Sequence, residues 1–240
     1  MFATPVSLRP MAQKKLQRFA DIKTFANVLE YPEHMPGQWH GFFKNENPII
    51  LELACGRGEY TIGLARLFPQ QNFIGVDVKG NRMYIGAKKG LNEGLHNAGF
   101  LRTQIERIAE FFAPGEVDEI WITFPDPQLR ISKAKKRLTH PRFLRLYQQF
   151  LKPSGLIHLK TDSPDLYDFT KKVIDMYDLT LMEDKDNVYA QSHIEEALKI
   201  KTHYESLDIA KSNTIHYLQF SLPAVIKNID DQLQEQLRNG

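Results

Sequence analysis

The chain lacks the features that would place it among secreted, metal-clustered or membrane-spanning proteins. Its single cysteine, Cys55, excludes an intramolecular disulfide and a cysteine-based zinc cluster. No uninterrupted apolar run approaches the ~20 residues of a membrane-spanning helix. Residues 1–19 are broken by Pro5 and Pro10 and lack the apolar core of a signal peptide. We therefore expect a soluble, cytoplasmic protein without membrane contact.

An excess of charge of one sign is also missing. The formal net charge is only +2, so the total does not indicate a nucleic-acid-binding protein, and any such evidence must come from local clusters. Hydrophobic residues make up 42% and charged residues 25%, which is typical of a folded globular chain. A length of 240 residues suits one large α/β domain.

Two parts differ in character along the chain. Residues 1–47 show little periodicity and are punctuated by Pro32, Pro36 and Gly37. We predict that they form a basic N-terminal arm and an irregular segment that packs on the core. Residues 48–240 are predicted to form the main part of a single domain.

Apolar runs alternate with helical patterns from residue 48 onward, which predicts a doubly wound, mostly parallel α/β sheet. The final two strands are expected to close the sheet as an antiparallel hairpin with a long insertion. A helix over 142–151 is expected to stop at Pro153 and Gly155. The predicted strands are residues 49–53, 72–78, 99–103, 119–124, 156–160, 179–182 and 214–222.

Residues suited to bind a nucleotide follow the first two strands. In a doubly wound sheet the ligand lies beyond the carboxyl ends of the strands. Glu52, Gly56 and Gly58 end the first strand, and Asp77 ends the second. The glycines permit a tight turn and close approach of a ligand, and the Asp77 carboxylate is suited to accept both hydroxyls of a ribose.

The glycine pattern bears on which nucleotide is bound. A dinucleotide fingerprint requires G-x-G-x-x-G, and Thr61 stands at the third glycine position. Without that glycine we expect no close packing of helix on strand, which disfavours NAD. The pattern E-x-x-x-G-x-G resembles class I S-adenosylmethionine-dependent methyltransferases, although a glycine turn without a ligand remains an alternative.

A stiff acidic turn and a basic stretch follow the fourth strand. The two prolines of Phe124-Pro125-Asp126-Pro127 fix the backbone around a carboxylate. A cluster of cations comes next, and beside a candidate active site it predicts contacts with phosphates, although a charge run is usually a solvated face. These cations are Arg130, Lys133, Lys135, Lys136, Arg137, Arg142 and Arg145.

Five motifs in a fixed order carry a more specific resemblance. They are Gly56-x-Gly58, Phe124-Pro125-Asp126-Pro127, Lys136-Arg137-Leu138, Thr161-Asp162 and Thr202-His203-Tyr204-Glu205. Together they resemble the tRNA (guanine-N7-)-methyltransferase family in its bacterial single-subunit form, over residues 48–222. The resemblance implies a Rossmann-like methyltransferase fold, S-adenosylmethionine as cofactor, and methylation of guanine N7 in the variable loop of tRNA.

The resemblance also implies roles for individual residues. Cofactor contacts fall at Glu52, Gly56, Gly58, Asp77, Gln104 and Asp126, and Asp126 is the candidate catalytic residue. Substrate contacts fall at Arg130, Asp162, Thr202, His203, Tyr204 and Glu205. Asp162 or Glu205 would accept hydrogen bonds from guanine. The chain departs from the family at Gln128, where Trp is usual, and at Gln104, where an acidic residue is usual.

Other chemistries fit less well. Cys55 would suit a nucleophilic pyrimidine methyltransferase, but it lies in the glycine turn and is expected to be a small buried residue. An adenine-N6 methyltransferase needs an aromatic residue where Gln128 stands. An NAD-linked oxidoreductase is disfavoured because this chain lacks the third glycine of the dinucleotide fingerprint. A tRNA-binding protein without activity would not need the three carboxylates at the strand ends. We predict neither a metal site nor an obligatory protein partner, while methylation of another nucleic-acid base remains the alternative.

Overall fold

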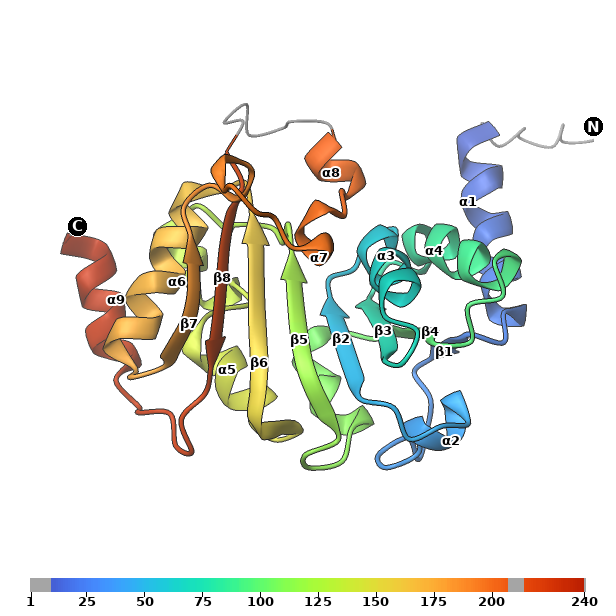
Figure 1. Ribbon diagram of the computed structural model, residues 1–240, viewed down its shortest axis with the longest axis horizontal. Helices are drawn as coiled ribbons and strands as arrows, with labels where there is room; N and C mark the ends of the chain where they lie inside the picture. Colours follow the sequence, from blue (N-terminus) through green and yellow to red (C-terminus); the bar gives the residue numbers. More distant parts are fainter. Residues whose placement is uncertain (1–9, 207–213, 240) are drawn as a thin grey trace, which may run out of the picture.

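The computed structural model describes residues 10–206 and 214–239. Its centre is an eight-stranded sheet in the order β1-β4-β3-β2-β5-β6-β8-β7. Only β8 runs antiparallel to its neighbours, which confirms the doubly wound sheet and its antiparallel closing strand (Figure 1). The strands are β1 Val28–Glu30, β2 Ile49–Leu53, β3 Asn72–Asp77, β4 Ala98–Arg102, β5 Val117–Thr123, β6 Leu151–Thr161, β7 Thr180–Lys185 and β8 His216–Ser221.

Helices cover both faces of this sheet. The α-helices are α1 Pro10–Asp21, α2 Trp39–Phe43, α3 Glu59–Leu67, α4 Gly80–Asn92, α5 Pro141–Tyr147, α6 Pro164–Met176, α7 Glu196–Lys199, α8 His203–Ser206 and α9 Asp230–Asn239. Short 3-10 helices are η1 Ile22–Thr24, η2 Ile105–Phe111, η3 Ile131–Lys136 and η4 Val188–Ala190. None of the helices in the described part of the chain has the length and apolarity needed to cross a membrane.

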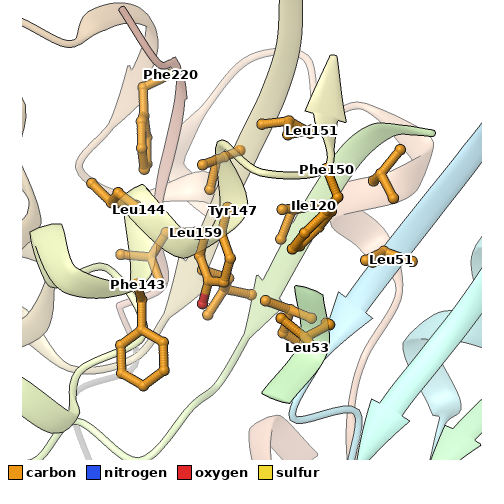
Figure 2. Packing of buried hydrophobic residues seen from close by; sticks show 14 of the residues in the cluster. Leu51, Leu53, Ile120, Phe143, Leu144, Tyr147, Phe150, Leu151, Leu159 and Phe220 are labelled. Carbon is orange, nitrogen blue, oxygen red and sulfur yellow. The ribbon is translucent and has the colours of Figure 1, made fainter. Parts of the chain in front are cut away.

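Alternation along the buried strands divides the core into two layers. In β2, Leu51 and Leu53 face the larger cluster, whereas Ile50 faces the other, because successive side chains of a strand point to opposite faces. Figure 2 shows the larger cluster, in which Leu144 and Tyr147 of α5 lie over the sheet. Apolar residues therefore fill both faces of the central strands, as a parallel sheet covered by helices requires.

The segment before Pro48 is more regular than its sequence indicates. It contains α1, α2 and strand β1, which pairs in parallel with β4, so the prediction of an irregular segment is wrong for these residues. Strand β1 has only three residues, which are too few to show the alternation of apolar and polar residues by which a strand is predicted. Trp39 is fully buried and donates from Nε1 to the Phe111 carbonyl at 2.8 Å. Residues 1–9 of the predicted arm lie outside the described chain, and the division at residue 48 stays a prediction.

Helix α5 is shorter than expected, and Pro153 does not terminate it. The helix ends at Tyr147, and Pro153 and Gly155 lie inside β6. The ladder with β5 shifts register here, passing from the Val117–Leu151 pair to the next one at Leu156. Because residues 152–155 have no partner in this ladder, proline's missing amide costs no hydrogen bond there.

Helix α3 packs closely on the sheet despite the missing third glycine, so the prediction of no close packing between this helix and the strand was wrong. The space comes from the strand side, where Gly75 in β3 faces Thr61. A Cβ built on Gly75 would lie 2.7 Å from Thr61 Oγ and 2.9 Å from the Phe100 ring. Close packing here therefore depends on a glycine in the strand, Gly75, and not on one in the helix.

This arrangement predicts that Gly75→Ala destabilises the fold. Thr61 cannot move away without losing its bonds to Glu52, so we expect a loss of about 2 kcal/mol in the free energy of unfolding, as for other overpacked cores. Urea denaturation measures it. Gly41→Ala is the matched control, since a Cβ there meets nothing within 4 Å. Equal stability of the two variants would contradict this explanation.

Candidate active site at the carboxyl ends of the strands

A tight turn joins β2 to α3 at the predicted ligand edge. Ala54, Gly56 and Gly58 all have left-handed backbones, with φ of 57°, 57° and 71°. Glycine adopts this region without a steric penalty, and at Gly58 a Cβ would also lie 2.5 Å from the Phe100 ring. The turn thus brings the first amides of α3 to the end of β2. Cys55 is buried in it, as expected for a small core residue.

Asp77 holds this turn in place from the neighbouring strand. Its Oδ2 accepts the Gly56 amide at 2.9 Å, and its Oδ1 accepts the Lys79 amide at 2.8 Å. A carboxylate offers about four acceptor sites, so two backbone bonds leave capacity for ligand hydroxyls. Asp77 therefore shapes the site as well as lining it.

Glu52 is buried beneath the turn. Its Oε2 accepts the Thr61 amide at 2.8 Å and also the Thr61 hydroxyl, and its Oε1 accepts the Thr123 hydroxyl at 2.7 Å. Burial raises the pKa of Glu52 to about 7, and the hydrogen bonds from Thr61 and Thr123 oppose this rise. The carboxyl therefore links the ends of β2 and β5 to the start of α3.

The raised pKa predicts a pH-dependent stability. The ordinary pKa is 4.5, so between pH 4.5 and about 7 the folded chain holds a proton that the unfolded chain has released. Stability therefore falls as pH rises through this window, by on the order of 3 kcal/mol from this group. Glu52→Gln imitates the neutral carboxyl and should flatten the dependence. Thermal unfolding of both proteins between pH 5 and 8 measures the difference, and parallel profiles would contradict it.

The acidic turn after β5 is conformationally constrained. Phe124 and Gln128, at its two ends, have left-handed φ angles of 47° and 48°, which is uncommon for such residues. Asp126 lies exposed between them and accepts the Gln128 amide at 3.0 Å. Arg137, which is buried, donates to the carbonyls of Pro127 and Gln128 at 3.0 and 3.3 Å. The hydrogen bonds from Arg137 therefore fix the turn in addition to its two prolines.

One pocket of about 590 Å³ collects most of the predicted site residues, a size within the ~300–1,000 Å³ of small-molecule sites. Gly58 shapes the turn without lining this pocket. Arg130, His203 and Glu205 also lie outside its lining, and the side chain of Tyr204 is outside what the structure describes. The predicted residues that line it are Glu52, Gly56, Asp77, Gln104, Asp126, Asp162 and Thr202.

The basic stretch divides into structural and exposed cations. Arg137 lies 4.4 Å from the Phe169 ring centroid, and Arg145 pairs with Asp230. Arg145 also lies in the last turn of α5, where the helix dipole favours a cation, so this helix position and the ion pair account for Arg145 without a phosphate. The cations that remain exposed are Arg130, Lys133, Lys135, Lys136 and Arg142.

The roles of two cations at the site were not predicted from the sequence. Arg137 supports the acidic turn but resembles its exposed neighbours in sequence. Lys160 is fully buried at the end of β6, and the signal for it was a lone charge in the apolar run of residues 156–160. His158 in that run is a core residue, because it is buried and its ring stacks on Trp121 with the ring centroids 4.0 Å apart.

The sheet order, antiparallel β8 and pocket at the strand ends define the Rossmann-like methyltransferase class. Solved structures agree on this fold. The crystal structure of the 16S rRNA methyltransferase KamB superposes with a TM-score of 0.60, at 15% identity, over 80% of this chain and 95% of that one. An A1408 ribosomal methyltransferase from an uncultured bacterium gives 0.57 at 17% identity, over 78% and 93%. At such identities the likeness concerns the fold alone.

Sequence comparison narrows the class to a family. A family model described as a putative methyltransferase matches residues 46–218. The tRNA (guanine-N(7)-)-methyltransferase of Bacteroides thetaiotaomicron is 47% identical over 222 residues, covering 89% of this chain and 87% of that protein. The Porphyromonas gingivalis protein of the same name is 49% identical over 213 residues, covering 84% and 86%. The chain belongs to the tRNA (guanine-N(7)-)-methyltransferase family.

Proposed function

We propose that this chain transfers a methyl group from S-adenosylmethionine to N7 of a guanosine in tRNA. The observation that carries the proposal is the convergence of Glu52, Asp77 and Asp126 on one pocket at the strand ends, in a chain of this family. The variable loop is the proposed target region. We also propose that the enzyme works without a protein partner and in the cytoplasm, where bacterial tRNA is found.

The residues of the pocket fit the proposed cofactor. The Asp77 carboxylate has acceptor sites left for two ribose hydroxyls, and the Gln104 carbonyl can accept a bond from an adenine amino group. Gly56, in the left-handed turn, lines the pocket without a side chain. When bound, S-adenosylmethionine supplies an electrophilic methyl group on a sulfonium.

The proposed reaction needs alignment more than proton transfer. Guanine N7 carries a lone pair and no proton, so an in-line displacement requires no general base, and the enzyme contributes positioning and electrostatics. Positive charge develops on the guanine ring during transfer. We assign Asp126, on its constrained turn, to position the base and stabilise that charge. Asp162 and Thr202 line the same pocket and are assigned to contact the base.

The exposed cations are proposed to hold the tRNA backbone. Arg130, Lys133 and Lys135 lie exposed on and beside η3, next to the turn that carries Asp126. Lys136 lines the pocket itself. Cations at these places suit phosphates that flank a base bound in the pocket, and such contacts position RNA without reading its sequence.

A transcript that lacks N7 tests the proposal. Purified protein is incubated with labelled S-adenosylmethionine and a tRNA transcript made with guanosine or with 7-deazaguanosine. We expect label only in the guanosine transcript. Equal labelling of both would reject N7 as the acceptor and leave a methyltransferase for another base, while binding of cofactor without labelling would point to another acceptor molecule.

A further inference from the structure

A fully buried lysine at the end of β6 has no part in the chemistry above. The Lys160 ammonium donates to the carbonyls of Leu198 and Ile200 at 2.8 and 2.9 Å and to Glu205 Oε2 at 3.0 Å. Its side chain is 0% exposed. Burial of an ammonium costs several kcal/mol unless its donors are satisfied, and here all three have acceptors. An aliphatic side chain would fill the same space but could not make these three bonds. The bonds therefore indicate the role of the charge.

Lys160 connects the two walls at the base-binding end of the pocket. Its carbonyl accepts the amide of Phe124, the first residue of the acidic turn, at 2.8 Å. Its ammonium lies 5.5 Å from the centroid of the Phe124 ring. The acceptors of that ammonium belong to the insertion between β7 and β8, which also carries Thr202. Figure 1 shows α7 and α8 of this insertion at the carboxyl ends of β5 and β6.

Glu205 is the counter-charge of this lysine and does not line the pocket. Its side chain is only 4% exposed. Both carboxylate oxygens are engaged, because Oε2 accepts from Lys160 and Oε1 accepts the Tyr189 hydroxyl. The backbone is also tied to the pocket, since the Glu205 amide donates to Thr202 Oγ at 3.1 Å. Glu205 is therefore placed to orient the Thr202 segment and not to face the base directly.

We propose that Lys160 is a positioning residue that holds the turn of Asp126 and the segment of Thr202 at the spacing a guanine requires. Glu205 acts through Lys160 and does not read the base. This inference rests on the proposed function for its substrate, but the tie between β6 and the insertion can be measured without substrate. Burial lowers the pKa of Lys160 and Glu205 opposes this, so loss of either partner leaves a poorly compensated charge.

The test compares Lys160→Met, Glu205→Gln and the double variant with Lys152→Met as the matched control. Lys152 lies on the same strand and pairs with Asp118, but its side chain is 44% exposed. It lies at the start of β6, whereas Lys160 lies at the end of the strand next to the pocket. For Lys160→Met we expect kcat for tRNA methylation to fall at least about tenfold, since small displacements of a reacting group cost this much or more. The Kd for S-adenosylmethionine should stay within about twofold, because the three hydrogen bonds of the Lys160 ammonium go to the insertion, whereas Asp77 holds the turn after β2.

The double variant separates positioning from stability. Removing both charges relieves the unpaired ion, so its Tm should recover towards the wild-type value while kcat stays low. A kcat for Lys160→Met within tenfold of wild type would overturn the proposal. So would recovery of kcat together with Tm in the double variant, or a parallel loss of cofactor affinity, since each indicates a merely structural role.

Two further measurements cover the other outcomes. If Lys160→Met fails to fold, Tyr189→Phe decides, because it removes one bond to Glu205 without burying an unpaired charge. A severalfold lower kcat supports the proposal and an unchanged kcat overturns it.

If wild-type protein proves not to methylate tRNA, the proposed function fails separately. Amide hydrogen exchange over residues 196–205 then decides: faster exchange in Lys160→Met but not in Lys152→Met supports the tie, and equal exchange refutes it.

Discussion

Asp126→Asn is expected to lower kcat for methyl transfer by about 10²–10³-fold, the range seen when a preorganised electrostatic group is removed from an active site. The asparagine preserves shape and can still accept the Gln128 amide, so the turn should keep its conformation. What is lost is the negative charge next to the positive charge that develops on the guanine. Single-turnover rates with saturating tRNA and cofactor measure this step without a contribution from product release.

Asp168→Asn is the control for that experiment, because Asp168 is also an exposed aspartate but lies on α6 outside the pocket lining. It should leave kcat unchanged. A rate for Asp126→Asn within a few-fold of wild type, with cofactor and tRNA affinities intact, would remove Asp126 from the catalytic role. A loss confined to tRNA affinity would make it a binding residue only.

Asp77→Asn is expected to weaken S-adenosylmethionine binding by about 100-fold. In the asparagine an NH2 group, which only donates, replaces one of the two carboxylate oxygens that accept from Gly56 and Lys79, and the ribose hydroxyls meet an amide in place of a carboxylate. Losing a charge-assisted hydrogen bond to a ribose hydroxyl costs about 2–3 kcal/mol of binding free energy, which corresponds to about two decades in affinity. Calorimetric titration with S-adenosylmethionine or its demethylated product measures the change.

The stability of the variant must be measured beside its affinity, because Asp77 also holds the turn. A normal Tm with weakened binding supports a direct role at the cofactor. An unchanged Kd would show that the ligand lies elsewhere in the pocket and would contradict the assignment of the β2–β3 edge to the cofactor.

Much of this site could be predicted because its chemistry follows strand ends. Buried parallel strands leave apolar runs in the sequence, and the residues directly after them meet at one edge of the sheet. Glu52, Asp77 and Asp126 were found in this way, and all three line the pocket. The resemblance supplied Asp162 and Thr202, which come from segments with no readable local pattern.

The remaining features depend on tertiary contacts that leave weak local signals. Gly75 replaces the third glycine of the fingerprint only because β3 passes under α3, which spacing along one segment does not reveal. Arg137 and Arg145 are indistinguishable in sequence from the exposed cations beside them, and their partners lie at Pro127 and in α9. The partners of Lys160 lie 38 to 45 residues further along the chain.

The methylated nucleoside itself shows whether this chain methylates guanine N7 in tRNA. An unmodified tRNA transcript is treated with wild-type protein and isotopically labelled S-adenosylmethionine, digested to nucleosides, and analysed by mass spectrometry beside the Asp126→Asn reaction. We predict labelled N7-methylguanosine with the wild-type protein and little or none with the variant. A different labelled nucleoside, or equal yields from the two proteins, would contradict it.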